Sequence, residues 1–258
     1  MSDKKKIVIK VGTSTLTYDT GEINLRRIEL LSQVICDLNH SGCEVVLVSS
    51  GAIAVGVSKM GFDKRPDLVC EKQAVSAVGQ RELMGLYGKF FGEFGCSVAQ
   101  ILLTKNVLED ETRRTNAVNA FRTLLDWGVV PIVNENDVIS TAEIEFGDND
   151  TLSAVVAELV GADALIILSD IDGLFDKDPA KFPDAKLISE VGEITDELMK
   201  SAGGAGTNRG TGGMVTKLIA AKHAREVGVE MWIINGRNPK TIYDVLEGKP
   251  VGTKFKLK

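Results

Sequence analysis

Runs of apolar, mostly β-branched residues recur along the chain and alternate with segments of helical periodicity. The runs cover residues 7–11, 44–48, 98–103, 129–133, 165–168 and 230–234. They are continuous rather than alternating, which is typical of strands buried on both faces. Strands of this kind, separated by helices, form mainly parallel sheets. We therefore predict an α/β fold in which a mainly parallel sheet is covered by helices on both faces.

Amphipathic helices are predicted between these strands. Asn24 can cap a helix whose apolar face begins with Ile28 and Leu31. Similar patterns cover 76–94, 115–127, 151–160 and 214–227. The apolar face of 76–94 packs either into the core, which we favour, or against a partner molecule.

Two segments depart from this alternation. Residues 138–146 alternate apolar and polar positions as a β-hairpin does, and residues 172–189 follow neither pattern. We interpret both as excursions from the sheet. No Pro/Ser-rich linker or repeat divides the chain, so we expect one domain over residues 1–258. Its two lobes are expected at residues 1–164 and 165–258.

Composition and charge exclude several classes of protein. Of the 258 residues, 44% are hydrophobic and 26% are charged, as in globular proteins. The net charge of −6 argues against nucleic acid as a partner, so an anionic ligand must be met by local positive groups. No apolar segment is long enough for a membrane span or a secretory signal.

Cysteine and histidine usage narrows the chemistry further. The four cysteines form no Cys-x-x-Cys pair, and the two histidines cannot supply a zinc cluster or the relay of a serine hydrolase. We expect reduced thiols and a cytoplasmic location.

Two glycine-containing segments are candidate phosphate sites. Residues 210–217 read Gly-Thr-Gly-Gly-Met-Val-Thr-Lys and lead into a helix, whose free N–H groups and partial positive charge attract anions. Lys217 lies about one turn into this helix. After the first strand, Lys10 precedes a glycine turn with two hydroxyl residues. Taken singly, each segment also fits an ordinary surface turn.

Small polar residues follow other strands as well, at the edge where open parallel sheets bind ligands. Ser50 and Gly51 begin a helix and suit an anionic group. Residues 134–137 read Asn-Glu-Asn-Asp and residues 146–150 read Phe-Gly-Asp-Asn-Asp. Their acidic groups fit an ammonium and their amides a carboxylate, although turns favour the same residues. Ser169 and Asp170 end the fifth strand, where Ser169 fits a nucleotide and Asp170 fits pairing with lysines.

Taken together and in this order, these segments resemble the amino-acid kinase family, and within it the kinases that phosphorylate glutamate. The resemblance rests on Ile-Lys-Val-Gly-Thr-Ser, Val-Ser-Ser-Gly-Ala-Ile, Asn-Glu-Asn-Asp, Phe-Gly-Asp-Asn-Asp, Ser-Asp-Ile-Asp-Gly-Leu and Gly-Thr-Gly-Gly-Met-x-Thr-Lys, which extend from Lys10 to Lys217. The first and last are shared across the family, whereas the third and fourth point to glutamate. A three-layer α/β/α sandwich with a mainly parallel central sheet is implied.

The resemblance also implies an activity, the transfer of the γ-phosphoryl group of ATP to the side-chain carboxylate of L-glutamate in proline biosynthesis. Lys10 and Lys217 would be catalytic and bind phosphate oxygens, and Asp170 would hold both lysines in place. The ATP site would further contain Ser169, Thr211, Gly212, Gly213, Met214, Val215 and Thr216. Glutamate would be bound by Ser50, Asp137 and Asn149, with Gly51, Asn134, Asp148 and Asp150 close by. Mg²⁺ would be held by phosphates and water rather than by a metal site of protein ligands.

Further expectations follow from the same resemblance. Val215 stands where the family often has serine, which puts a side-chain contact there in doubt. No C-terminal PUA domain is expected, whereas feedback inhibition by L-proline and a homo-oligomer, dimer or tetramer, are. The alternatives are an acetylglutamate or uridylate kinase and a non-catalytic sensor. The N-acetylated amine and the uracil of those acceptors carry no ammonium group for Asp137 and Asp148 to bind. A sensor would not need all of Lys10, Asp170 and Lys217.

Overall fold

The computed structural model describes residues 4–18, 20–140, 149–202 and 213–257. Its centre is an eight-stranded sheet with the order β3-β4-β2-β1-β5-β7-β8-β6. Every pairing of neighbouring strands in this sheet is parallel except that of β7 with β8. The strands are β1 (Lys6–Val11), β2 (Glu44–Ser49), β3 (Val98–Leu103), β4 (Val130–Glu135), β5 (Ala164–Ser169), β6 (Glu190–Val191), β7 (Glu230–Asn235) and β8 (Thr253–Phe255).

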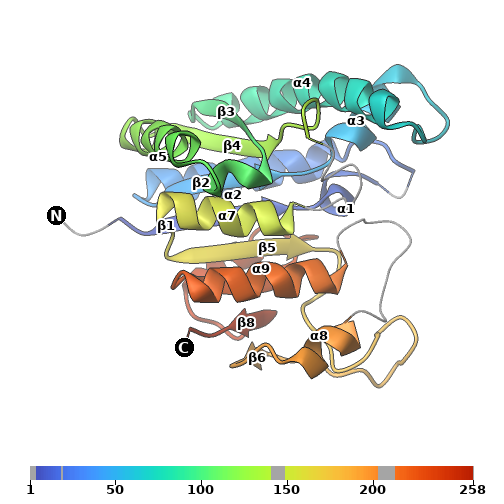
Figure 1. Cartoon of the computed structure of the whole chain (residues 1–258), viewed down its shortest axis with the longest axis vertical. Coiled ribbons are helices and arrows are strands. Elements are labelled where there is room, and N and C mark those ends of the chain that lie inside the picture. Colours follow the sequence, from blue (N-terminus) through green and yellow to red (C-terminus); the bar gives the residue numbers. More distant parts are fainter. Residues whose placement is uncertain (1–3, 19, 141–148, 203–212, 258) are drawn as a thin grey trace.

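Helices cover both faces of the sheet, which gives the three layers seen in Figure 1. Residues of α2, α4 and α10 pack in one hydrophobic cluster, and residues of α5, α7 and α9 pack in another on the opposite face. The helices are α1 (Thr13–Leu16), α2 (Leu25–His40), α3 (Ala52–Met60), α4 (Val69–Glu93), the 3₁₀ helix η1 (Lys105–Leu108), α5 (Glu111–Asp126), α7 (Asp150–Val160), α8 (Asp196–Ala202), α9 (Met214–Glu226) and α10 (Thr241–Leu246).

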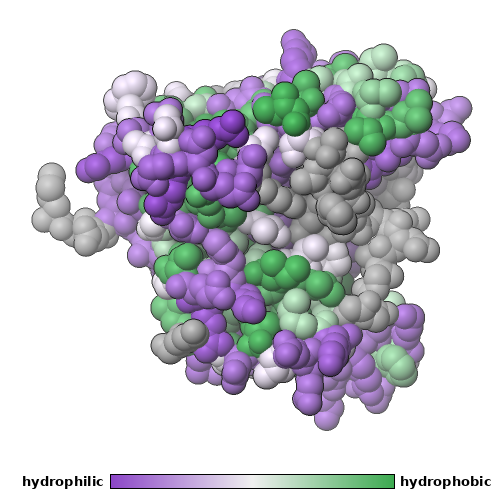
Figure 2. Space-filling view, viewed as in Figure 1, coloured by the Kyte–Doolittle hydropathy of each residue, from purple (hydrophilic) through white to green (hydrophobic). Residues whose placement is uncertain are grey.

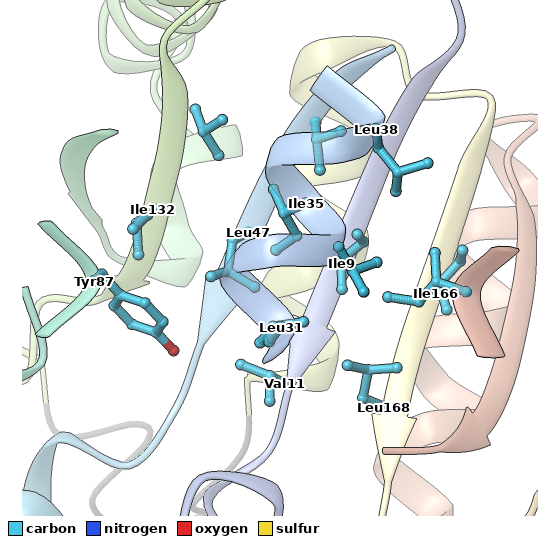
Figure 3. Close-up of a cluster of buried hydrophobic side chains, with 14 of the residues drawn as sticks. Ile9, Val11, Leu31, Ile35, Leu38, Leu47, Tyr87, Ile132, Ile166 and Leu168 are labelled. Carbon is cyan, nitrogen blue, oxygen red and sulfur yellow. The ribbon is translucent and has the colours of Figure 1, made fainter. Parts of the chain in front are cut away.

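Both faces of the central strands are buried, as the continuous apolar runs predict. In β1, Ile7, Ile9 and Val11 face the cluster with α2, whereas Val8 belongs to the opposite cluster. Figure 3 shows Ile9 and Val11 beside Leu31 of α2. The prediction of a mainly parallel sheet inside an α/β/α sandwich is confirmed.

Helix starts are the least accurate part of the prediction. α4 begins at Val69 rather than at residue 76, and α5 begins at Glu111 rather than at residue 115. Asp110 caps α5 by accepting a hydrogen bond of 2.9 Å from the N–H of Arg113. The first turn of α5 is polar, so hydrophobic periodicity could not reveal it.

The two predicted excursions have different outcomes. Residues 137–139 form a turn, but most of the hairpin proposed for 138–146 lies outside the described residues. Residues 172–189 do leave the sheet, and an antiparallel bridge between Phe175 and Leu187 ties the ends of this segment together.

Two glycines allow α3 and α4 to cross with their backbones in contact. A Cβ atom on Gly79 would overlap the carbonyl oxygen of Ala52, and one on Gly56 would overlap that of Val75. The crossing holds the start of α3, which directly follows β2, against the first half of α4.

The apolar face of α4 belongs to the core, as favoured above. Leu83, Phe90 and Phe91 are buried in the hydrophobic cluster that also contains residues of α2. Apolar side chains reach the surface instead around the α3–α4 connection, where Met60 is 50% and Leu68 is 60% exposed. Green patches interrupt the mainly hydrophilic face in Figure 2. None of the described helices combines the length and apolarity that crossing a membrane requires.

Candidate active site

The predicted site residues that the structure describes lie at or near the carboxyl edge of the sheet. In the register of the central strands, Val11 of β1 lies opposite Ser49 of β2 and Leu168 of β5, so these strands end together. The segments that follow them, and the N-terminal ends of α3 and α7, therefore surround one edge (Figure 1). Ligands bind at this edge in open α/β sheets.

Two lysines from distant parts of the chain meet at one carboxylate. Lys10 Nζ of β1 lies 2.6 Å from Asp150 Oδ1, and Lys217 Nζ of α9 lies 3.0 Å from Asp150 Oδ2. The side chain of Asp150 is fully buried, and those of Lys10 and Lys217 are 6% and 9% exposed. Thr216 Oγ1 donates a further hydrogen bond of 3.1 Å to Asp150 Oδ2.

The local structure explains why Asp150 is ionised although it is buried. It is the first residue of α7, where the helix dipole favours a negative charge. Burial alone would raise the pKa of Asp150, but attraction to Lys10 and Lys217 outweighs it and holds the pKa well below its usual range. The group is therefore an anion at neutral pH, and the cluster carries one net positive charge.

The structure differs from the expectation that Asp170 would hold both lysines. Asp170 is exposed beyond the end of β5 and accepts a hydrogen bond of 3.2 Å from Ser169 Oγ. The lysines pair with Asp150, which the sequence indicated only as a neighbour of the acceptor. The chain that connects β4 to β5 must pass over β2 and β1, and this brings the start of α7 over Lys10.

Asn149, the residue before Asp150, contacts Asn134. Asn149 Nδ2 donates hydrogen bonds of 2.7 Å to the carbonyl oxygen of Ser49 and 2.6 Å to Asn134 Oδ1. Asp137 is buried and accepts a hydrogen bond from Ser76 of α4. Ser50 is buried as well, whereas Asp148 lies outside the described residues.

A cavity of about 540 Å³ opens beside Asp137. Gly51 and Asp137 line it, as does Thr13 of α1. Lys64 and Arg65, from the connection between α3 and α4, also line this cavity, and the sequence did not indicate them. Two adjacent basic residues in a loop usually mark only a solvated surface, so the sequence offered little reason to assign Lys64 and Arg65 to a binding site.

A second cavity lies toward the C-terminal half of the chain. It measures about 120 Å³ and is lined by residues that include Ser169, Asp170, Gly213, Met214 and Lys217. Thr211 and Gly212 of the glycine-rich segment lie outside the described residues. Of the two lysines expected to be catalytic, Lys217 lines the second cavity.

The family follows from comparison with known proteins. A model of the amino acid kinase family matches residues 5–235. The chain belongs to this family. A protein named glutamate 5-kinase from Clostridium perfringens is 58% identical to this amino acid kinase over all of the chain and 97% of its own length. Another of that name, from Listeria innocua, is 50% identical over all of the chain and 95% of its own length.

Solved structures of low sequence identity share the fold of this amino acid kinase. Carbamate kinase from Giardia lamblia has a TM-score of 0.68 at 20% identity, and each chain covers all of the other. A UMP kinase from Bacillus anthracis has a TM-score of 0.64 at 18% identity, with 98% of this chain and 96% of that chain covered. The side chain of Val215 packs against the hydrophobic cluster around α7 and α9, which accounts for an apolar residue there.

Proposed function

We propose that this amino acid kinase transfers the γ-phosphoryl group of ATP to the side-chain carboxylate of L-glutamate and forms L-glutamyl 5-phosphate. The observation that carries the proposal is the buried cluster of Lys10, Asp150 and Lys217, whose Lys217 lines the second cavity. A polyanionic donor and an anionic acceptor can meet only where positive charge is preorganised. The relatives named glutamate 5-kinase support glutamate as the acceptor.

The reaction needs no general base. The acceptor carboxylate has an intrinsic pKa of about 4.3 and is ionised at neutral pH. One of its oxygens forms a bond to the γ-phosphorus while the bond from that phosphorus to the β,γ-bridging oxygen breaks, and ADP leaves with the electron pair. No proton is transferred in this step. The chain contains only two histidines, and this small number does not argue against the reaction, because no general base is needed.

The two lysines would supply charge where it develops. Their ammonium groups would donate hydrogen bonds to oxygens of the transferring phosphoryl group and of the leaving phosphate. Asp150 would hold both ammonium groups at one point and offset their mutual repulsion before ATP arrives. Asp170 and Ser169, which line the second cavity, would contact the nucleotide.

The first cavity would bind the acceptor. The carboxylate of Asp137 would attract the ammonium group of glutamate, which an N-acetylated amine or a uracil lacks. Lys64 and Arg65 would attract its α-carboxylate. The sequence also proposed Ser50, Gly51, Asn134, Asp148 and Asn149 for this site, and it proposed Asp150, which pairs with the lysines.

Mg²⁺ would accompany ATP. Within the ranges described, no group of three His, Cys, Asp or Glu side chains is arranged to hold a metal ion. Asp150 is already paired with two lysines, so it is a poor candidate for a ligand. The ion would be held mainly by phosphate oxygens and water, as Mg²⁺ commonly is in kinases, and would neutralise phosphate charge.

Trapping of the acyl phosphate with hydroxylamine tests the proposal. The purified protein is incubated with Mg²⁺, ATP and one of four acceptors, namely L-glutamate, N-acetylglutamate, aspartate or UMP. We expect a hydroxamate with glutamate alone, and release of ADP with glutamate alone, because phosphorylation of UMP would give UDP, which hydroxylamine does not trap. A product from another acceptor would refute the assignment of the first cavity, and ATP binding without any product would favour a sensor.

Three further properties belong to the proposal. L-Proline would compete with glutamate, because it carries the same α-carboxylate and ammonium pair, and a competitive pattern in initial rates would support this. The protein would assemble as a homo-oligomer, dimer or tetramer. Its location would be cytoplasmic, in keeping with the four free cysteines.

A further inference from the structure

Helix α4 carries polar side chains toward the acceptor site. Ser76 and Gln80 are one turn apart, so they lie on the same face of the helix. Ser76 donates to Asp137, and Gln80 Oε1 accepts a hydrogen bond of 2.8 Å from Asn134 Nδ2. Ser76 and Gln80 therefore contact two residues expected to bind the acceptor, although they belong to none of the motifs.

Gln80 begins a chain of amide groups whose orientation the hydrogen bonds determine. Asn134 Oδ1 accepts a bond of 2.9 Å from the backbone N–H of Glu135, which can only donate. Asn134 Nδ2 is therefore the atom that faces Gln80 Oε1. With Asn134 oriented in this way, its Oδ1 also accepts from Asn149 Nδ2.

The consequence for Asn149 is a carbonyl oxygen left for a ligand. Its Nδ2 group donates to Asn134 Oδ1 and to the carbonyl oxygen of Ser49, which uses both of its hydrogens. Asn149 is fully buried, and within the described part of the chain its Oδ1 atom has no hydrogen-bond partner. A buried acceptor without a donor is unfavourable, so this atom is suited to a ligand that donates hydrogen bonds.

We propose that Gln80 is a positioning residue for acceptor binding, which acts through Asn134 to keep Asn149 Oδ1 directed to the ammonium group of the acceptor amino acid. This inference rests on the proposed function, because it takes glutamate as the acceptor. Without the carbonyl oxygen of Gln80, the Asn134 amide loses one of the bonds that set its orientation. Asn149 can then rotate and present its NH₂ group, a donor, to an ammonium that can only donate.

The perturbation should be selective for the acceptor. Gln80 lies on α4, whereas the nucleotide side is formed by the segment after β5 and the start of α9. Gln80 is also partly exposed, so replacement by a side chain of similar length should leave the fold intact. Its loss should therefore raise the KM for glutamate without changing the KM for ATP.

Three variants test the positioning role. Gln80→Leu removes the acceptor oxygen, Gln80→Glu keeps an oxygen that can accept from Asn134, and Gln33→Leu makes the same substitution at an exposed position of α2. We expect Gln80→Leu to raise the KM for glutamate about fivefold, the effect of one hydrogen bond, with kcat and the KM for ATP within about twofold. Gln80→Glu and Gln33→Leu should stay within about twofold of the unmodified protein.

Glutarate, which is glutamate without the amino group, separates the ammonium from the rest of the ligand. As a competitive inhibitor against glutamate, it should have the same inhibition constant in Gln80→Leu and in the unmodified protein, within about twofold. An equal loss for both ligands, or an equal loss of kcat and both KM values in Gln80→Leu and Gln80→Glu, would show a merely structural role. An unchanged KM for glutamate would also overturn the proposal.

Two controls keep the result interpretable. Thermal unfolding shows whether each variant is folded, and Gln80→Ala replaces Gln80→Leu if the latter does not fold. Formation of glutamyl hydroxamate by the unmodified protein is measured first. If it forms, failure of the Gln80 variants to behave as expected refutes only the positioning role, and if it does not form, both proposals fall.

Discussion

Replacement of Asp150 by asparagine should destabilise the protein and abolish most of its activity, whereas the same change at Asp170 should leave the stability unchanged. Asn has the shape of Asp but no charge, and one of its two polar atoms is a donor that would face an ammonium group. Lys10 and Lys217 would then be two buried cations without the carboxylate that now lies 2.6 and 3.0 Å away. Removal of one partner from a buried ion pair costs about 3–5 kcal/mol.

The size of this effect makes it easy to measure. For a domain of this length, 1 kcal/mol shifts Tm by about 2–4 °C, so Asp150→Asn should lower Tm by roughly 6–20 °C. Urea unfolding gives the free energy directly, and an unchanged m-value would show that the folded state is the same. Asp170→Asn should keep the Tm of the unmodified protein, because its side chain is exposed and an amide oxygen can still accept from Ser169.

The pH dependence of the free energy of unfolding provides a second test of the interaction between Asp150 and the two lysines. Asp150 has a folded-state pKa below its unfolded value of about 3.9, so its contribution to stability is complete above that value. The contribution is lost as the pH falls toward the folded-state pKa. The stability difference between the unmodified protein and Asp150→Asn should therefore be constant from about pH 5 to 8 and shrink below about pH 4.

Two results would refute this reasoning. Equal stability of Asp150→Asn and the unmodified protein would mean that the cluster does not hold two charged lysines together. A loss of stability and activity in Asp170→Asn, with Asp150→Asn unaffected, would restore the role that the sequence motif suggested for Asp170.

Other parts of the structure lead to three further predictions. Lys10→Ala should lower kcat on the order of a hundredfold in the hydroxamate assay, as loss of one preorganised donor does, and near-normal turnover would contradict its role. Gly79→Ala should lower the free energy of unfolding by about 1–3 kcal/mol or more, because the added methyl group overlaps the backbone of α3. Gly85→Ala, on the same helix but with open space around it, should raise that free energy by about 0.5–1 kcal/mol, and equal effects in urea unfolding would argue against the close crossing. Among the thiols, the exposed Cys70 should react first with a thiol reagent, whereas Cys36, whose pKa burial raises well above its usual range, should react only on unfolding.

The strands of the sheet were predictable because they are buried on both faces. Continuous apolar runs identify such strands, and the structure places all six within two residues of the expected positions. β8 could not be found in this way, because it has only three residues and includes a buried polar one, Thr253. β6 is shorter still.

The sequence indicated residues for the candidate site but could not indicate all of their contacts. Lys10 and Lys217 belong to recognisable glycine-containing segments, and the structure brings them together. Which carboxylate meets them depends on the order of strands in the sheet, and no local pattern states this order. Asp150 and Asp170 look alike in the sequence, yet Asp150 is the buried first residue of α7, whereas Asp170 follows the end of β5 and is exposed. Gln80 lies in the middle of a long helix, where nothing distinguishes it from a solvent-exposed glutamine.

The crossing at Gly56 and Gly79 limits how the specificity of this enzyme can be changed by design. Because the two backbones touch, neither helix can slide or tilt to make room for a bulkier acceptor without breaking the contact. The start of α3 and the polar face of α4 therefore behave as one rigid wall. A variant that accepts a larger substrate would have to gain its space from the loops opposite this wall, and libraries that vary α3 or α4 at the crossing should yield mostly unfolded protein.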